Sequence, residues 1–199
     1  AGSIVNGSGK NITVSAEGSA YGMMAISGSN GGKNFTDVES AVDNRGNITV
    51  TAGDTAYGIY SAVKGDVKNS GKITINGAGY GIFNQNGSVN SSGTGEKGSY
   101  GIYAEAEAGS GNKITNAADI TMTFAPEEEG GDDEEEQPTL PANYGIYGWN
   151  VDIENSGSVS ITQQNEKSED VFGIVSEESS INNSGTVVIN GNGSAVYAG

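Results

Sequence analysis

The densest group of chemically reactive side chains in the sequence is a run of eight carboxylates. The run consists of Glu127, Glu128, Glu129, Asp132, Asp133, Glu134, Glu135 and Glu136. Carboxylates at this density attract Ca²⁺ or a basic protein surface. Their spacing matches neither an EF-hand nor a glycine-aspartate nonapeptide repeat, so the sequence predicts no preformed calcium site and no cofactor.

The acidic run is bracketed by the prolines at positions 126, 138 and 141. Proline cannot donate to a β-ladder, so the strand pattern is interrupted here. We predict a solvated loop insertion over residues 125–142, with contact to a basic partner as the alternative reading.

Two single aromatic residues are further candidates for partner contact. Phe35 lies in a stretch rich in Gly, Ser and Asn, for which we predict a loop insertion over residues 23–41. Trp149 is the only tryptophan and follows a predicted strand. We expect the Trp149 ring to lie half exposed at a strand end, packed on the wall of the fold or contacting a protein or carbohydrate.

The composition excludes several common classes of catalytic and metal-binding site. The chain contains no His and no Cys, which excludes Ser-His-Asp and Cys-His nucleophiles and zinc sites built from those residues. We therefore expect no catalytic residue, no metal ligand and a non-enzymatic protein. The formal net charge of -16 makes nucleic acid an unsuitable partner. No apolar run approaches the ~20 residues of a membrane-spanning helix, so we expect no direct membrane insertion.

The elements that must position these residues are repeated. One motif reads aromatic-Gly-apolar-aromatic, with Tyr57-Gly58-Ile59-Tyr60 as its best copy. It recurs at positions 80–83, 100–103 and 144–147, and weaker copies start at 21, 172 and 194. Such self-similarity at spacings of 20 to 44 residues indicates a solenoid with insertions between some units.

A second motif joins an apolar residue to an Asn-Ser-Gly turn and an alternating apolar run, as in Ile153 to Ile161. Asn and Gly tolerate the backbone angles of sharp corners, and stacked Asn side chains can hydrogen-bond from layer to layer. We predict such an amide ladder at Asn44, Asn69, Asn116, Asn155 and Asn183.

Together the motifs predict an all-β protein. Hydrophobic residues make up only 34% of the chain and Gly numbers 33, as expected for a thin core with many tight turns. We predict one right-handed parallel β-helix over residues 1–199, with about seven coils of three short strands. Its interior is expected to hold Ile, Val and Tyr, and the Gly after each Tyr to let neighbouring coils approach closely.

The two motifs resemble those of passenger domains of bacterial autotransporters, the type V secreted surface proteins. The resemblance extends over nearly the whole chain and implies a segment of a longer passenger. It further implies a location at the surface of a Gram-negative bacterium, anchored to the outer membrane or secreted. The implied function is that of an adhesin or stalk, which binds a protein or glycan on host or bacterial surfaces through its loops.

A polysaccharide-active β-helix enzyme of the pectin lyase type is the alternative. Such enzymes use a carboxylate cluster on one face of the coil, or Ca²⁺ with a basic residue. The only arginine, Arg45, lies in a turn motif, and the acidic residues outside the 125–142 run do not recur around a cleft.

Overall fold

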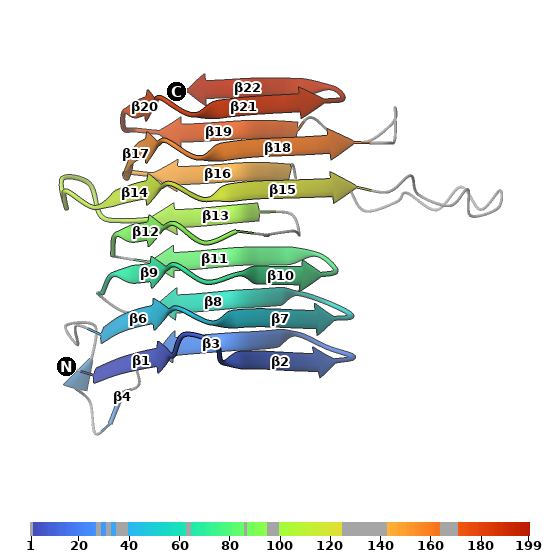
Figure 1. Ribbon diagram of the computed structural model, residues 1–199. Coiled ribbons are helices and arrows are strands. Elements are labelled where there is room, and N and C mark those ends of the chain that lie inside the picture. The colour runs from blue at the N-terminus through green and yellow to red at the C-terminus, as the bar shows by residue number, and fades with distance from the viewer. Residues whose placement is uncertain are drawn as a thin grey trace, which may run out of the picture.

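The computed structural model describes residues 2–26, 29–30, 33–34, 40–62, 65–85, 87–94, 100–124, 143–163 and 171–199. Its strands wind into seven stacked coils, and this confirms the predicted parallel β-helix (Figure 1). Every pairing between coils is parallel and in register, and the chain climbs by one coil after each set of strands. The two termini lie at opposite ends of the stack.

Three walls enclose the interior of the coil. The first sheet runs through all seven coils and contains β1 (Gly2–Asn6), β6 (Ser40–Asn44), β9 (Val67–Asn69), β12 (Val89–Ser91), β14 (Lys113–Asn116), β17 (Asp152–Asn155) and β20 (Ile181–Asn183).

The middle wall consists of two separate three-stranded sheets. One contains β2 (Asn11–Ala16), β7 (Asn47–Ala52) and β10 (Ile73–Asn76), and the other contains β15 (Asp119–Phe124), β18 (Ser158–Gln163) and β21 (Thr186–Asn190). In the fourth coil, the described residues 87–94 and 100–105 add no strand to this wall.

The third wall, here called the aromatic sheet, again runs through all seven coils. It contains β3 (Ala20–Ile26), β8 (Ala56–Ala62), β11 (Gly79–Gln85), β13 (Tyr100–Glu105), β16 (Asn143–Trp149), β19 (Val171–Glu177) and β22 (Gly193–Ala198). β3 continues to Ile26 and β6 begins at Ser40, so strands occupy both ends of the loop expected over 23–41. Between them lies an antiparallel hairpin of β4 (Ser29–Asn30) and β5 (Lys33–Asn34).

Aliphatic side chains fill the interior in rows that run along the coil axis. Ile59, Ile82, Ile102 and Ile146 stack in register on the aromatic sheet, and each is fully buried. Ile48 and Ile73 form an equivalent row on the middle wall. Burying each such side chain stabilises the fold by roughly 1.5–3 kcal/mol, so these rows can hold the stack together.

An amide ladder follows the corner between the first sheet and the middle wall. Asn6 donates to Asn44 and Asn44 donates to Asn69, each from Nδ2 to Oδ1 at 2.8 Å. In the later coils, Asn116 donates to Asn155 and Asn155 to Asn183, each at 2.7 Å. Pairing of this kind offsets the cost of placing amides in the interior.

Two positions of the ladder differ from the sequence expectation. Asn6 is an additional rung, supplied by the Asn-Gly-Ser-Gly stretch that starts at position 6. In the fourth coil the rung is Ser91, whose Oγ accepts from Asn69 at 3.4 Å. The ladder therefore consists of two sets of three asparagines with a serine between them.

Candidate functional site

The expectation that tyrosines fill the interior is wrong, because their rings lie on the outer surface of the aromatic sheet. Along β8 the inward, buried positions are Ala56, Gly58, Ile59 and Ser61, whereas Tyr57 and Tyr60 are partly exposed. The two residues between the tyrosines both face inward, so aromatic residues three positions apart share the outer face. Strict alternation would have placed them on opposite faces.

The outward rings form two columns parallel to the coil axis, which together we call the aromatic face. Column one contains Tyr21, Tyr57, Tyr80, Tyr100, Tyr144 and Phe172, and column two contains Tyr60, Phe83, Tyr103 and Tyr147. Within the columns, ring centroids are 4.6 to 5.3 Å apart. Rings of neighbouring columns meet edge to face, as Tyr57 and Tyr60 do at 5.1 Å. Both geometries are favourable for aromatic pairs.

Glycine makes this spacing feasible. A Cβ at Gly58 would lie 2.5 Å from both the Gly81 carbonyl oxygen and Ile73 Cγ2, atoms of the next coil. Gly22 is in the same position, with the Gly58 carbonyl oxygen 2.7 Å from the site of a Cβ. The Gly in the motif therefore allows neighbouring coils to approach each other closely, as expected from the sequence.

Stacking also determines which parts of the rings the aromatic face exposes to solvent. Because each ring covers the face of its neighbour, the surface exposes ring edges along most of its length. Burial raises the pKa of Tyr57 to about 12. It also raises the pKa of Tyr147 to about 12, with a further contribution from the adjacent Glu177 carboxylate. The pKa values of Tyr100 and Tyr103 are raised by burial as well.

These shifts predict that the fold loses stability in alkali. The pKa of tyrosine in an unfolded chain is about 10, so the folded chain holds its phenolic protons more tightly. The resulting stability is fully present below about pH 10 and is lost between about pH 10 and 12. We expect the phenolate absorbance to rise together with the loss of the strand signal in circular dichroism. The same chain unfolded in urea should titrate near pH 10; titration of Tyr57, Tyr100 and Tyr147 at that pH in a chain with intact strands would contradict this prediction.

Beyond column two, the last outward positions of four strands form a polar row that we call the rim. Gln85, Glu105, Trp149 and Glu177 occupy it in successive coils, in register with one another. The Glu105 carboxylate accepts hydrogen bonds from the Gln85 amide and, at 2.8 Å, from the Tyr103 hydroxyl. Trp149 is 45% exposed, at the end of its strand as expected.

Comparisons with protein-family models, curated proteins and solved structures find no match to this chain.

The other sequence-predicted contact residues lie outside the described part of the chain. They are Phe35, Glu127, Glu128, Glu129, Asp132, Asp133, Glu134, Glu135 and Glu136. Among the described residues, no three His, Cys, Asp or Glu side chains are grouped to hold a metal ion. Within the same ranges, no helix is long and apolar enough to cross a membrane.

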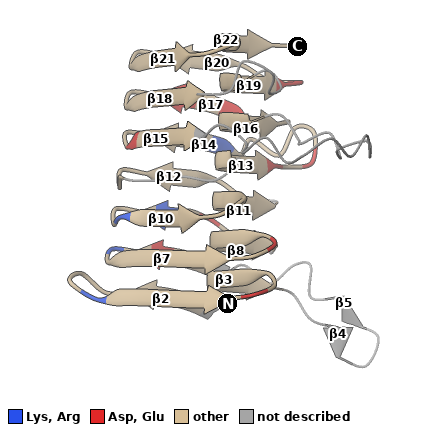
Figure 2. Ribbon diagram, turned by 90° about the vertical axis from the view of Figure 1, so that its right-hand side faces the viewer, with Lys and Arg blue, Asp and Glu red and all other residues tan. Residues whose placement is uncertain are grey.

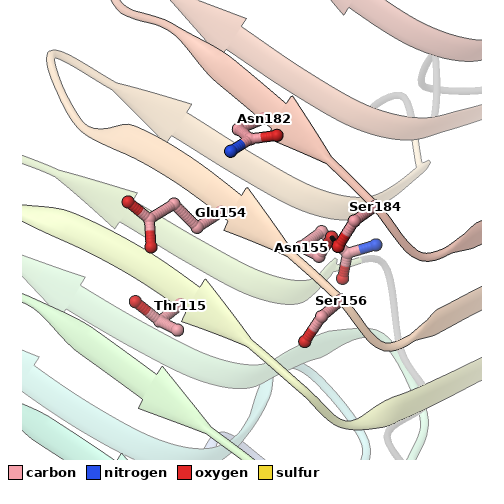
Figure 3. Close-up of a pocket in the computed structure, with 6 residues that line it drawn as sticks. All are labelled: Thr115, Glu154, Asn155, Ser156, Asn182 and Ser184. Atoms are coloured by element: carbon pink, nitrogen blue, oxygen red, sulfur yellow. Dashed lines mark hydrogen bonds between the residues drawn. The ribbon is translucent and has the colours of Figure 1, made fainter.

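A shallow polar depression of about 170 Å³ lies on the outer side of the first sheet (Figure 3). It is lined by Thr115, Glu154, Asn155, Ser156, Asn182 and Ser184. Glu154 is the single carboxylate in this lining, and Lys113 Nζ pairs with it at 2.8 Å. Glycoside hydrolysis generally needs two carboxylates that flank the scissile bond, and this depression provides one.

The two-residue alternation of an ordinary strand does not predict the aromatic face, because it places residues three positions apart on opposite sides. The signal that predicts it is the constant spacing of three between the two rings of the four best copies, each with Gly in second position. In each of the four best copies, the Gly and the Ile between the two rings occupy consecutive buried positions, so both rings lie on the outer side.

Proposed function

We propose that the chain is a non-enzymatic adhesin or stalk segment of a bacterial surface protein, of the kind found in autotransporter passengers. Its place would be the surface of a Gram-negative cell or the secreted fraction. The partner would be a protein or glycan on a host or bacterial surface.

The aromatic face is the observation that carries this proposal. It is a continuous side face of stacked rings, which spans six of the seven coils and is held by a rigid parallel sheet. At ~4.8 Å per coil, the solenoid extends roughly 30 Å from its first to its last coil. Tyrosine and tryptophan are enriched where proteins bind partners, because they supply a large contact area at little entropic cost. Such a face suits contact along the side of a stalk.

The test is binding of the labelled chain to host cells, bacterial cells and immobilised glycans. In the face variant, Tyr60, Tyr103 and Tyr147 are each replaced by threonine, which keeps a strand-forming residue at each position. In the control variant, the outward Thr49, Thr74 and Ser160 of the middle wall become alanine. Circular dichroism verifies that both variants fold. We expect the face variant to lose most of the binding and the control variant to retain it.

A third variant lacks residues 125–142 and tests whether the acidic segment, and not the aromatic face, makes the contact. Binding lost only by this deletion would assign recognition to the acidic segment and contradict the role of the face. A wild-type chain that binds none of these surfaces would be a passive spacer. Turnover of acidic polysaccharides, with or without Ca²⁺, would replace the proposal by the enzymatic alternative.

A further inference from the structure

The rim of the aromatic face places an exposed indole between two carboxylates. Trp149 at the end of β16 pairs in register with Glu105 of β13 on one side and with Glu177 of β19 on the other. Neighbouring coils are ~4.8 Å apart, so each carboxylate is attached one coil away from the indole. A flat aromatic surface flanked on both sides by negative charge is a favourable place for a cation.

Both carboxylates lie beside a tyrosine of column two, and hydrogen bonds orient that of Glu105. The Tyr103 hydroxyl donates to Glu105 Oε2, and the Gln85 amide donates to Oε1 of the same carboxylate. Glu177 lies close enough to the Tyr147 hydroxyl to add to the rise of the Tyr147 pKa that burial causes. A carboxylate offers about four acceptor positions, so each retains capacity for an incoming donor. The Glu105 carboxylate is therefore held in place before any ligand arrives, and the Glu177 carboxylate lies next to the Tyr147 hydroxyl.

The backbone fixes the end of the rim strands. Ala106 N donates to the Trp149 carbonyl oxygen at 3.1 Å, and Asn150 N donates to the Glu177 carbonyl oxygen at 3.0 Å. Asn150 and Glu178, which directly follow Trp149 and Glu177, have φ angles of 55° and 62°. The chain thus turns sharply at the same place in both coils and leaves the rim side chains at a corner.

Charge is segregated around the coil. The strands of the aromatic sheet contain no Lys or Arg, and their only charged residues are Glu105 and Glu177. Basic residues such as Lys10, Arg45 and Lys72 lie in the turns that precede the middle-wall strands, on another corner (Figure 2). The aromatic face therefore carries negative charge alone, within a chain of net charge -16.

We propose that Trp149, Glu105 and Glu177 bind an arginine side chain presented by a partner protein. The planar guanidinium can stack on the indole and at the same time donate paired hydrogen bonds to a flanking carboxylate. Lysine carries a compact, strongly hydrated charge and cannot make both contacts in this way. The proposal rests on the adhesive function proposed above and names the chemistry that the aromatic face recognises.

Because Trp149 is the only tryptophan of the chain, tryptophan fluorescence reports directly on this site. The full chain is titrated with acetylated tri-arginine amide, and the fluorescence of Trp149 is followed. We expect a saturable change that weakens with added salt. Tri-lysine amide should bind several-fold more weakly, and tri-citrulline amide, which has the same shape without the charge, should not bind.

Substitutions separate the site from general attraction to an acidic protein. The Glu105→Gln/Glu177→Gln variant should weaken tri-arginine binding by about tenfold or more, because both charged acceptors are lost. The matched control is Glu128→Gln/Glu135→Gln in the acidic segment, which changes the net charge by the same two units and should bind almost as well as the wild type. Trp149→Ala, followed by calorimetry, should also lose most of the binding.

Equal losses in the site variant and the charge-matched control would overturn the proposal, and so would equal binding of tri-citrulline or unchanged binding by Trp149→Ala. Cell-surface binding that survives Glu105→Gln/Glu177→Gln would also overturn it while leaving the adhesive function in place. Conversely, selective tri-arginine binding by a chain that binds no surface would support the site and count against the adhesive function alone.

Discussion

Replacing Gly145 with alanine is expected to lower the free energy of unfolding by about 3 kcal/mol or more. Gly145 is the buried glycine of the aromatic motif in β16, at the contact between the fifth and sixth coils. A Cβ there would lie 2.6 Å from the Gly173 carbonyl oxygen and still closer to Val159 Cγ1. One of these atoms belongs to the backbone of the next coil, so relief requires the two coils to separate locally.

Gly18→Ala is the matched control for this substitution. A Cβ at Gly18 would lie 3.5 Å from Asp54 Oδ2, which is an ordinary contact with a movable side chain. We expect the free energy of unfolding to change by less than about 1 kcal/mol. Urea denaturation followed by circular dichroism measures both variants. Equal stabilities of Gly145→Ala and Gly18→Ala would show that the close approach of the coils at Gly145 is not required.

The second large effect is expected at the amide ladder, where Asn155→Ala should cost about 3 kcal/mol. Asn155 is 2% exposed, accepts from Asn116 and donates to Asn183 and, at 3.2 Å, to the Gly157 carbonyl oxygen. Alanine leaves the fully buried amide of Asn116 without its partner in the next coil. A buried polar group that loses its partner costs about 1–3 kcal/mol, and the emptied space adds to that cost.

Asn47→Ala provides the comparison on the surface. Asn47 makes the same kind of bond between coils, donating to Asn11 Oδ1 at 2.9 Å, but both side chains are exposed. Water replaces a lost partner there, so we expect a change below about 0.5 kcal/mol. Hydrogen exchange on each variant should show lost protection around Asn155 and none around Asn47. A similar small cost at both positions would mean that the buried ladder contributes little to stability.

The strands and corners could be predicted from sequence because each repeat contains the same local signals for a turn and for a strand. Asn-Ser-Gly at 155–157 and 183–185 is turn chemistry in any context, and the alternation in Ile73-Thr74-Ile75 gives a strand with one buried side. Repetition then implies stacking, since one coil cannot bury its own apolar side. These are local signals, and they were sufficient for the fold.

The candidate site could not be predicted in the same way. Whether Tyr57 faces in or out depends on how much space the interior has, and that is set by Ile73 of the following coil and by the absence of a side chain on Gly58. The rim depends on register: Glu105, Trp149 and Glu177 are 44 and 28 positions apart in sequence and become neighbours only after the insertions between them are accounted for.

The serine that divides the amide ladder has a mechanical consequence for a protein that is pulled along its length. Tension along the coil axis acts on each junction between neighbouring coils in turn, and these junctions are connected in series. The weakest junction is therefore the first to break. Bonds of 2.7 to 2.8 Å join the asparagines of the ladder on either side, whereas within the ladder Ser91 is joined only by a bond of 3.4 Å from Asn69. Force should therefore part the solenoid at its fourth coil, which has three coils with an intact ladder on each side.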